Sequence, residues 1–215
     1  MRSIPVVFVL LLGLWPAAAR AQQSLPSPEM PPTQWTHGPE LDVHVGAATS
    51  ASVTNAMFGG AVQWDVTPWF AAEGRGSWFD RGTDASAFSV DATALLNLVR
   101  KQTATPYVGA GLGIYRASFG PTASMPSFYR DRVTANAAGS TNTFTDPMLR
   151  FVFGVDIGGI PSESHWIVRP EVAALVVFGN GTNETMFTAT VSIGYQFRTF
   201  DRGADAGYSS IRENK

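Results

Sequence analysis

The sequence predicts an all-β protein, an eight-stranded antiparallel up-and-down β-barrel that crosses a membrane, and three observations support this prediction. Apolar and polar residues alternate along eight segments, and a helical period fits none of them as well. A secretory leader precedes them, and no other segment resembles a transmembrane helix. The last segment, 187–200, has one apolar and one polar face and exceeds the roughly 9–11 residues that a tilted strand needs to cross a bilayer.

The chain ends differ from the part expected to form the barrel, residues 39–200. Residues 1–21 are predicted to be a signal peptide, because a basic start and a short apolar run lead to the Ala19-Arg20-Ala21 cleavage pattern. A membrane anchor is the alternative, but the apolar run is too short to span a bilayer. Residues 22–38 are expected to form a Pro-rich disordered lead-in, and residues 201–215 a polar periplasmic tail.

The eight predicted strands lie between links of two kinds. The strands are 41–48, 57–66, 69–79, 87–99, 106–116, 148–158, 166–178 and 187–200. Links after even-numbered strands are tight or modest, whereas those after odd-numbered strands are polar, and one of them, 117–147, is long and without clear strand pattern. An even strand count with short turns on one side and longer loops on the other is typical of bacterial outer-membrane barrels.

Alternation alone does not determine which face points outward, because a soluble lipocalin-like barrel alternates as well. We predict the membrane orientation because the apolar faces of the strands carry no charge, whereas the opposite faces carry charges of both signs. These charges are expected to form ion pairs in a narrow lumen. They are Glu40, Asp42, Asp65, Glu73, Arg75, Asp91, Arg150, Asp156, Arg169, Glu171 and Arg198.

Closure of the barrel brings the first and last strands together, because unpaired strand edges are not tolerated in lipid. We therefore expect Arg198 to pair with Glu40 or Asp42 inside the barrel. An aromatic girdle is predicted on the short-turn side, formed by Trp64, Tyr107, Trp166, Tyr195 and Phe197.

Three glycines, Gly109, Gly111 and Gly113, share the inward face of one predicted strand. They are expected to make room for larger lumen neighbours such as Tyr107 and Tyr115. Local bending of the strand is an equal alternative.

The glycine-rich run from Pro106 to Gly113 and the Gly194-Tyr195-Gln196-Phe197 ending, on eight alternating strands, resemble opacity-type and OmpA/OmpX-type outer-membrane proteins. The resemblance covers residues 39–200 and implies a location in the bacterial outer membrane. It also implies that Tyr195, Phe197 and Phe200 are the assembly signal read by the barrel-assembly machinery. Members of this family often end on the terminal aromatic residue, whereas this chain continues to Lys215.

Residue content argues against several activities. The chain has no cysteine, and its net charge of −2 gives no reason to expect nucleic-acid binding. Its three histidines, His37, His44 and His165, lack the His-x-Ser spacing of barrel lipid A deacylases and are too scattered for a metal site. His44 is the one histidine expected to face the lumen, with no positioned nucleophile beside it. We therefore expect no enzyme activity and no cofactor.

The long polar link supplies the remaining candidates for function. Phe128, Tyr129, Arg130 and Arg132 are the possible loop contacts to a partner or to lipopolysaccharide, although a solvated loop without a ligand is an equal interpretation. The expected function is a structural, envelope-integrity or surface-interaction role of a monomer in outer-membrane lipid and lipopolysaccharide. The alternatives are a secreted soluble β-barrel that binds a small apolar ligand and a small low-conductance channel.

Overall fold

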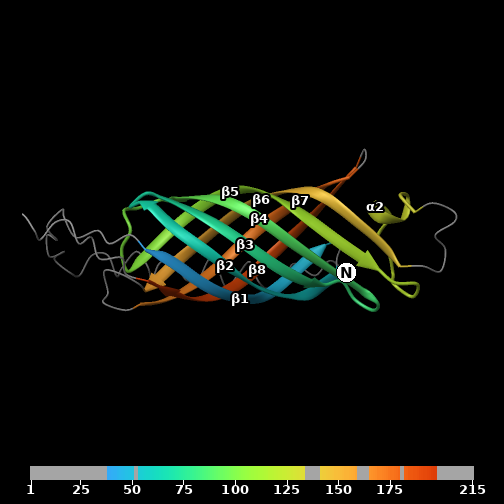
Figure 1. Ribbon diagram of the computed structural model, residues 1–215, viewed down its shortest axis with the longest axis horizontal. Coiled ribbons are helices and arrows are strands. Elements are labelled where there is room, and N and C mark those ends of the chain that lie inside the picture. The colour runs from blue at the N-terminus through green and yellow to red at the C-terminus, as the bar shows by residue number, and fades with distance from the viewer. Residues whose placement is uncertain (1–37, 51–52, 134–140, 159–164, 180–181, 198–215) are drawn as a thin grey trace, which may run out of the picture. The chain divides into compact units, whose positions relative to one another are not determined.

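A computed structural model describes residues 38–50, 53–133, 141–158, 165–179 and 182–197 (Figure 1). By its internal contacts the chain divides into Met1–Trp35 and Thr36–Lys215, and all described residues belong to the second unit. The predicted signal peptide, nearly all of the lead-in and the tail therefore lie outside the described residues and remain predictions. Among the described residues, no helix is long and apolar enough to cross a membrane.

The eight strands form a closed barrel in which each strand pairs with its neighbours in sequence and β1 pairs with β8, as the sequence predicted. Every pairing is antiparallel. The elements are β1 (Pro39–Ser50), β2 (Val53–Thr67), β3 (Phe70–Asp80), β4 (Ala85–Asn97), β5 (Ala104–Phe119), α2 (Ser127–Arg130), β6 (Asn142–Gly158), β7 (Trp166–Phe178) and β8 (Asn183–Gln196).

Both the start of β1 and the end of β8 lie at one end of the barrel, here called the terminal end. The opposite end, here called the loop end, carries the link between β5 and β6 and the short helix α2 (Figure 1). Of the four links at the loop end, only this one is long, because β1–β2, β3–β4 and β7–β8 are joined by residues 51–52, 81–84 and 179–182.

Strand bounds differ from the predicted ones mainly at the loop end. β5 continues to Phe119 and β6 begins at Asn142, so both ends of the link predicted to have no strand pattern are strand. β8 runs over Asn183–Gln196 rather than 187–200, and Phe197 follows it outside the ladder. The sequence missed these ends because serine, threonine and asparagine interrupt the apolar alternation there. The strands nevertheless continue, because backbone pairing with the adjacent strand does not depend on side-chain polarity.

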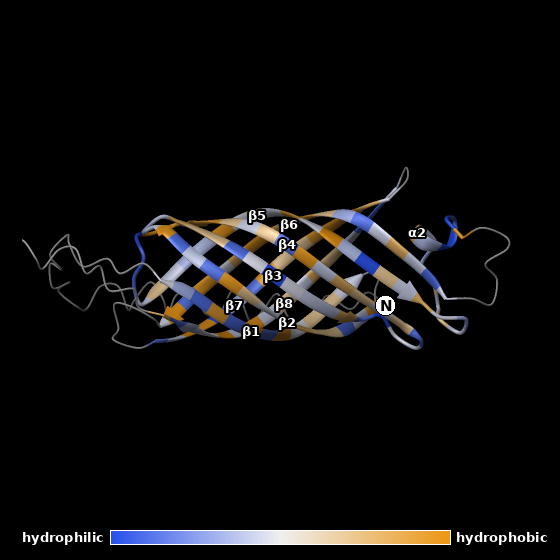
Figure 2. Ribbon diagram, viewed as in Figure 1, coloured by the Kyte–Doolittle hydropathy of each residue, from blue (hydrophilic) through white to orange (hydrophobic). Residues whose placement is uncertain are grey.

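Hydrophobic and hydrophilic residues alternate along the strands (Figure 2), and the large apolar side chains lie on the exterior of the barrel. Leu96, Phe151 and Val191 are 51%, 49% and 49% exposed on this wall. Glu73 and Arg150, by contrast, are each 2% exposed. This arrangement excludes a soluble barrel, whose apolar face would point inward.

The expectation of a charge-free outer face is wrong at two positions. Arg116 shares the outward parity of Leu112 and Ile114 and is exposed near the end of β5, and Asp80, the last residue of β3, shares the outward parity of Trp78. Their place at the loop end, where the strands leave the apolar band, explains why these positions accept a charge.

The lumen is filled along its length, as expected for eight strands. Charged and polar side chains occupy it from the middle to the terminal end. At the loop end apolar and aromatic side chains predominate, including Met57, Phe79, Phe119, Met148 and Leu175, and one buried ion pair, Arg81 with Glu184, lies among them. We refer to these parts as the charged half and the apolar half.

Candidate functional site: the packed lumen and the mouth of the barrel

Arg169 on β7 is the centre of the charged half. Its Nε donates to Asp156 Oδ1 at 2.6 Å, and its Nη2 donates to Glu40 Oε1 at 2.8 Å. Its Nη1 lies 3.1 Å from Asp42 Oδ2 and 3.2 Å from Glu73 Oε2. A fully buried guanidinium is thus surrounded by carboxylates from β1, β3 and β6, which ties strands on opposite sides of the barrel together.

A second group of ion pairs lies toward the middle of the barrel. Arg75 bridges Glu73, at 3.0 Å from Nε, and Glu171, at 3.0 Å from Nη2. Arg150 bridges the same two carboxylates, with its Nη1 2.8 Å from Glu73 Oε1 and its Nη2 on Glu171. The Tyr107 hydroxyl donates to Glu171 Oε2 at 2.9 Å. Each carboxylate therefore has several donors, as a buried charge requires.

The remaining charges predicted for the lumen have separate places. Asp91 lies 3.6 Å from Arg150 and accepts a hydrogen bond from Thr93. Asp65 pairs with Lys101, which lies in the turn between β4 and β5 and was not assigned a role from the sequence. Arg198 lies outside the described residues, so its predicted pair with Glu40 or Asp42 remains untested.

The hydrogen bonds of the charged half are unevenly distributed. Glu40 Oε2, Asp42 Oδ1 and His44 Nδ1 are buried without a hydrogen-bond partner among the described residues, and all three belong to β1. Gln63 Oε1, on β2 opposite Glu40, is also unpartnered. The wall around β1 is therefore bonded less completely than the wall that carries Arg75 and Arg150.

His44 has a nucleophile beside it, contrary to the prediction. Its Nε2 lies 3.0 Å from Ser77 Oγ, and its Nδ1 lies 3.8 Å from Asp42 Oδ1, beyond hydrogen-bond distance. Strand pairing brings these residues together from positions 33 apart in sequence, so sequence spacing could not reveal them. All three are buried, and the cavity next to Ser77 measures about 10 Å³, roughly the space of one water. No substrate can reach this group as it stands.

The apolar half is closed by the link between β5 and β6. Tyr129 of α2 is 0% exposed, with its ring centroid 4.9 Å from that of Phe119 and 5.2 Å from that of Phe144. Its neighbour Phe128 packs edge-on against it at 4.6 Å. The helix thus inserts an aromatic side chain into the end of the barrel and acts as a cap.

Arg132 fastens this cap to β6. Its Nη1 and Nη2 donate to the two carboxylate oxygens of Asp146, each at 2.8 Å. These hydrogen bonds raise the pKa of Arg132 above its ordinary value. The guanidinium also lies between two rings, 5.6 Å from the Phe128 centroid and 4.9 Å from the Phe144 centroid.

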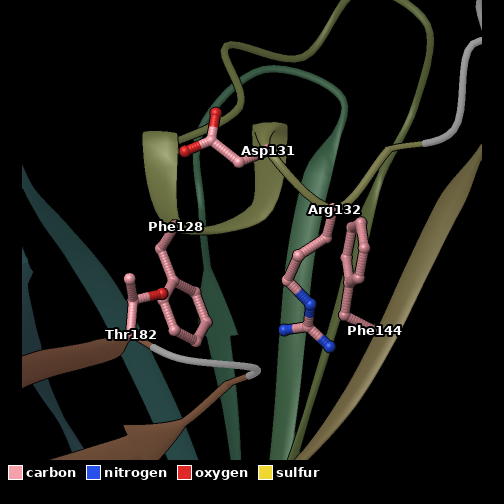
Figure 3. Close-up of a pocket in the computed structure, with 5 residues that line it drawn as sticks. All are labelled: Phe128, Asp131, Arg132, Phe144 and Thr182. Atoms are coloured by element: carbon pink, nitrogen blue, oxygen red, sulfur yellow. The ribbon is translucent and has the colours of Figure 1, made fainter.

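An open pocket of about 600 Å³ lies beside the cap. Figure 3 shows its walls, with Phe128 and Thr182 on one side, Arg132 and Phe144 on the other, and Asp131 above them. These side chains come from α2 and the residues after it, from β6, and from the link between β7 and β8.

The four possible loop contacts have different positions. Arg130 is exposed, and Phe128 and Arg132 line the pocket. Tyr129 is not available to an external partner because it fills the lumen. That this segment contacts a partner remains a prediction, and the sequence did not show which of its aromatic residues points inward.

The expected aromatic girdle is correct except for Tyr107, which is buried in the lumen. Trp166, Tyr195 and Phe197 lie together at the terminal end. The ring centroid of Tyr195 is 5.4 Å from that of Trp166 and 5.0 Å from that of Phe197. His165 stacks on Tyr195 at 5.2 Å. Phe200 lies outside the described residues, and the assembly role of Tyr195 and Phe197 remains a prediction.

The inward glycines do make room, but for side chains on the neighbouring strand. A Cβ on Gly111 would collide with Thr93 of β4, and one on Gly109 would lie 2.6 Å from a Leu95 methyl carbon. The residue that accommodates Tyr107 is Gly154 on β6, directly opposite it. Pairing register, which the sequence does not show, decides which side chain each glycine faces.

No protein-family model and no curated protein matches the chain. Among solved structures, it resembles neisserial surface protein A, with a TM-score of 0.54 and 15% identity over 75% of this chain and 97% of that one. The N-terminal β-barrel domain of Pseudomonas aeruginosa OprF gives 0.49 and 12%, over 74% and 97% of the two chains. The attachment invasion locus protein of Yersinia pestis gives 0.47 and 11%, over 75% and 97%.

At such low identities, the similarity to neisserial surface protein A supports the fold alone. The evidence that the barrel lies in a membrane comes from its outer wall. A closed barrel with an apolar exterior and a charged, filled interior is suited to lipid and unsuited to water. The chain is therefore an eight-stranded β-barrel of the outer-membrane type.

Proposed function

We propose that this protein is a closed, non-enzymatic barrel of the bacterial outer membrane that acts through its mouth, as a surface-interaction protein. The observation that carries the proposal is the combination of a packed lumen, capped by Tyr129, with an open pocket beside the cap. In the part of the chain that the structure describes, such a barrel offers a partner its ends and its outer wall, but not its interior.

The lumen supports neither of the other two activities. An enzyme would need access to His44 and Ser77, and both are buried behind packed side chains. A steady channel would need a continuous path past the arginine–carboxylate pairs and through the apolar half. A structural role in the envelope remains the second part of the proposal, since a filled barrel is a rigid element of the membrane.

The proposed partners follow from the surfaces. We expect the outer wall to contact outer-membrane lipid, and Arg116, which is exposed at the loop end, to meet lipopolysaccharide phosphates. The aromatic cluster around Tyr195 is proposed as the signal for the barrel-assembly machinery. We propose that the barrel works as a monomer.

The test separates the mouth from the barrel. A strain lacking the protein would be complemented with the wild type, with Phe128→Ala plus Arg132→Ala, and with Arg130→Ala as the control on an exposed neighbour. We expect all three to restore the permeability barrier to a hydrophobic dye, and only the Phe128/Arg132 variant to lose attachment to surfaces and cells. Full attachment by that variant, or steady ion conduction by the purified wild type in planar bilayers, would overturn the proposal.

A further inference from the structure

The mouth pocket combines features that define a class of ligand, and this inference rests on the proposed function. Its volume of about 600 Å³ falls within the range of small-molecule sites, roughly 300–1,000 Å³. It is open to the outside, so a ligand can be one unit of a larger molecule (Figure 3).

The apolar surface of the pocket is held in place. The Arg132 guanidinium lies between the rings of Phe128 and Phe144 and is fixed by two hydrogen bonds to Asp146. Behind Phe128 stands Gly179, where a Cβ would lie 2.7 Å from a ring carbon, so the ring packs directly on backbone. Rigid aromatic walls bind a flat apolar face at little cost in conformational entropy.

The polar groups of the pocket include both donors and acceptors. The bonds to Asp146 occupy two of the five N–H groups of Arg132, which leaves donors available. The Asp131 carboxylate, an acceptor, and the Thr182 hydroxyl, a donor and an acceptor, also line the pocket. A ligand whose hydroxyl groups both donate and accept would satisfy all three.

The charges around the pocket cancel. Asp146 neutralises Arg132, and the exposed Arg130 stands next to Asp131 in sequence. An anionic ligand would meet Asp131, and a cationic ligand would meet Arg132, so neither gains from the site as a whole.

We propose that this pocket binds a neutral pyranose unit of a surface saccharide. A pyranose ring has an apolar C–H face to lie against the parts of the half-buried Phe128 and Phe144 rings that Arg132 leaves uncovered, and hydroxyl groups to bond Asp131, Arg132 and Thr182. The saccharide can belong to the envelope of the same cell or to the surface of another, since both present the same chemistry.

Titration followed by NMR tests the proposal. The full chain would be isotopically labelled in dodecylphosphocholine micelles, which contain no sugar, and titrated with methyl β-D-glucopyranoside and methyl α-D-mannopyranoside. We expect saturable shifts at Phe128, Asp131, Arg132, Phe144 and Thr182 with at least one neutral glycoside. Glucuronate and glucosamine should bind at least about tenfold more weakly, because the charge of each comes next to a like charge, Asp131 or Arg132, while the site as a whole offers it no net attraction.

Two conservative variants examine the contacts. Phe128→Leu retains apolar volume without the ring, and Thr182→Val retains shape without the hydroxyl, so each should weaken the glycoside about tenfold. Arg130→Gln should leave binding unchanged. In each variant, unchanged chemical shifts for residues of the barrel strands would show that the fold is intact.

The outcomes are distinct from those of the proposed function. Absence of saturable shifts with both neutral glycosides, or equal binding of glucuronate, would overturn the saccharide site even if the mouth variant still lost attachment. If the site binds, inhibition of attachment by polysaccharide from the producing strain, compared with that from the target surface, would identify the source.

Discussion

The two halves of the lumen fill similar spaces by different means. In the charged half, Arg169, Arg150 and Arg75 bond carboxylates from several strands, and each contact depends on direction and distance. In the apolar half, side chains such as Phe79 and Leu175 pack by shape, under Tyr129. The comparison shows that the lumen of a narrow barrel can be filled either by hydrogen-bonded charged side chains or by closely packed apolar ones. Substitutions in the two halves should therefore destabilise the barrel in different ways.

The position of each half follows from what lies beyond it. At the loop end, the apolar side chains continue into the cap, so helix α2 has an apolar surface on which to dock. Toward the terminal end the lumen carries charged and polar groups, including Asp65 with Lys101 of the turn. The proposed function at the mouth therefore depends on the apolar half, whereas the charged half ties β1, β3, β6 and β7 together.

The largest effect is expected from Arg169→Met. Removing the guanidinium leaves Glu40, Asp42 and Asp156, carboxylates of β1 and β6, buried without their arginine, and breaking buried ion pairs in this way costs about 3–5 kcal/mol. Urea unfolding of the barrel in lipid vesicles, followed by gel mobility, measures the loss. Arg100→Met, at an exposed turn position, is the control, and equal stability of the two variants would refute the role of Arg169.

A somewhat smaller loss is expected from Leu175→Ala in the apolar half. The substitution leaves a cavity in the apolar cluster that includes Tyr129 of the cap, and such changes cost about 2–5 kcal/mol depending on how far the site collapses. The same unfolding experiment applies, combined with proteolysis of the β5–β6 link. We expect this link to become more sensitive to protease in Leu175→Ala than in Arg169→Met. The reverse order would contradict the division of the lumen into two halves.

Gly154→Ala should cost about 1–3 kcal/mol, the usual range for overpacking. The added methyl group would collide with Tyr107, whose hydroxyl is bonded to Glu171 in the charged half. Gly74→Ala is the matched control, because a Cβ there meets nothing within 4 Å on the outer wall. If both variants were equally stable, Tyr107 would have room that the structure does not show.

The smallest effect is expected from Asp42→Asn. Asp42 gives one oxygen to Arg169, while its other oxygen has no partner among the described residues, so loss of its charge should cost less than about 1 kcal/mol. Glu73→Gln is the comparison, because Glu73 accepts from three arginines and should lose several times more. Equal losses would show that the wall around β1 is as well bonded as the opposite wall.

Much of the fold could be predicted because side chains alternate between the two faces of a strand, so an error of one residue in the assignment of faces is easily recognised. A shift by one residue would place Glu73 or Arg150 in lipid, so alternation alone identifies the lumen side. The apolar half was missed because Phe79 and Met148 at inward positions look the same as outward apolar residues near strand ends. Tyr129 was missed as a cap because nothing local distinguishes a buried loop aromatic residue from an exposed one.

The amino-acid sequence by itself determined the strand number, the face of each strand and the sign of each lumen charge, because these depend on local order and on the transfer of side chains between water and lipid. The tertiary structure alone decided which groups meet: Arg169 with four carboxylates, His44 with Ser77, and Arg132 with two rings and Asp146. Those contacts depend on register and closure, which join residues up to 129 positions apart in sequence.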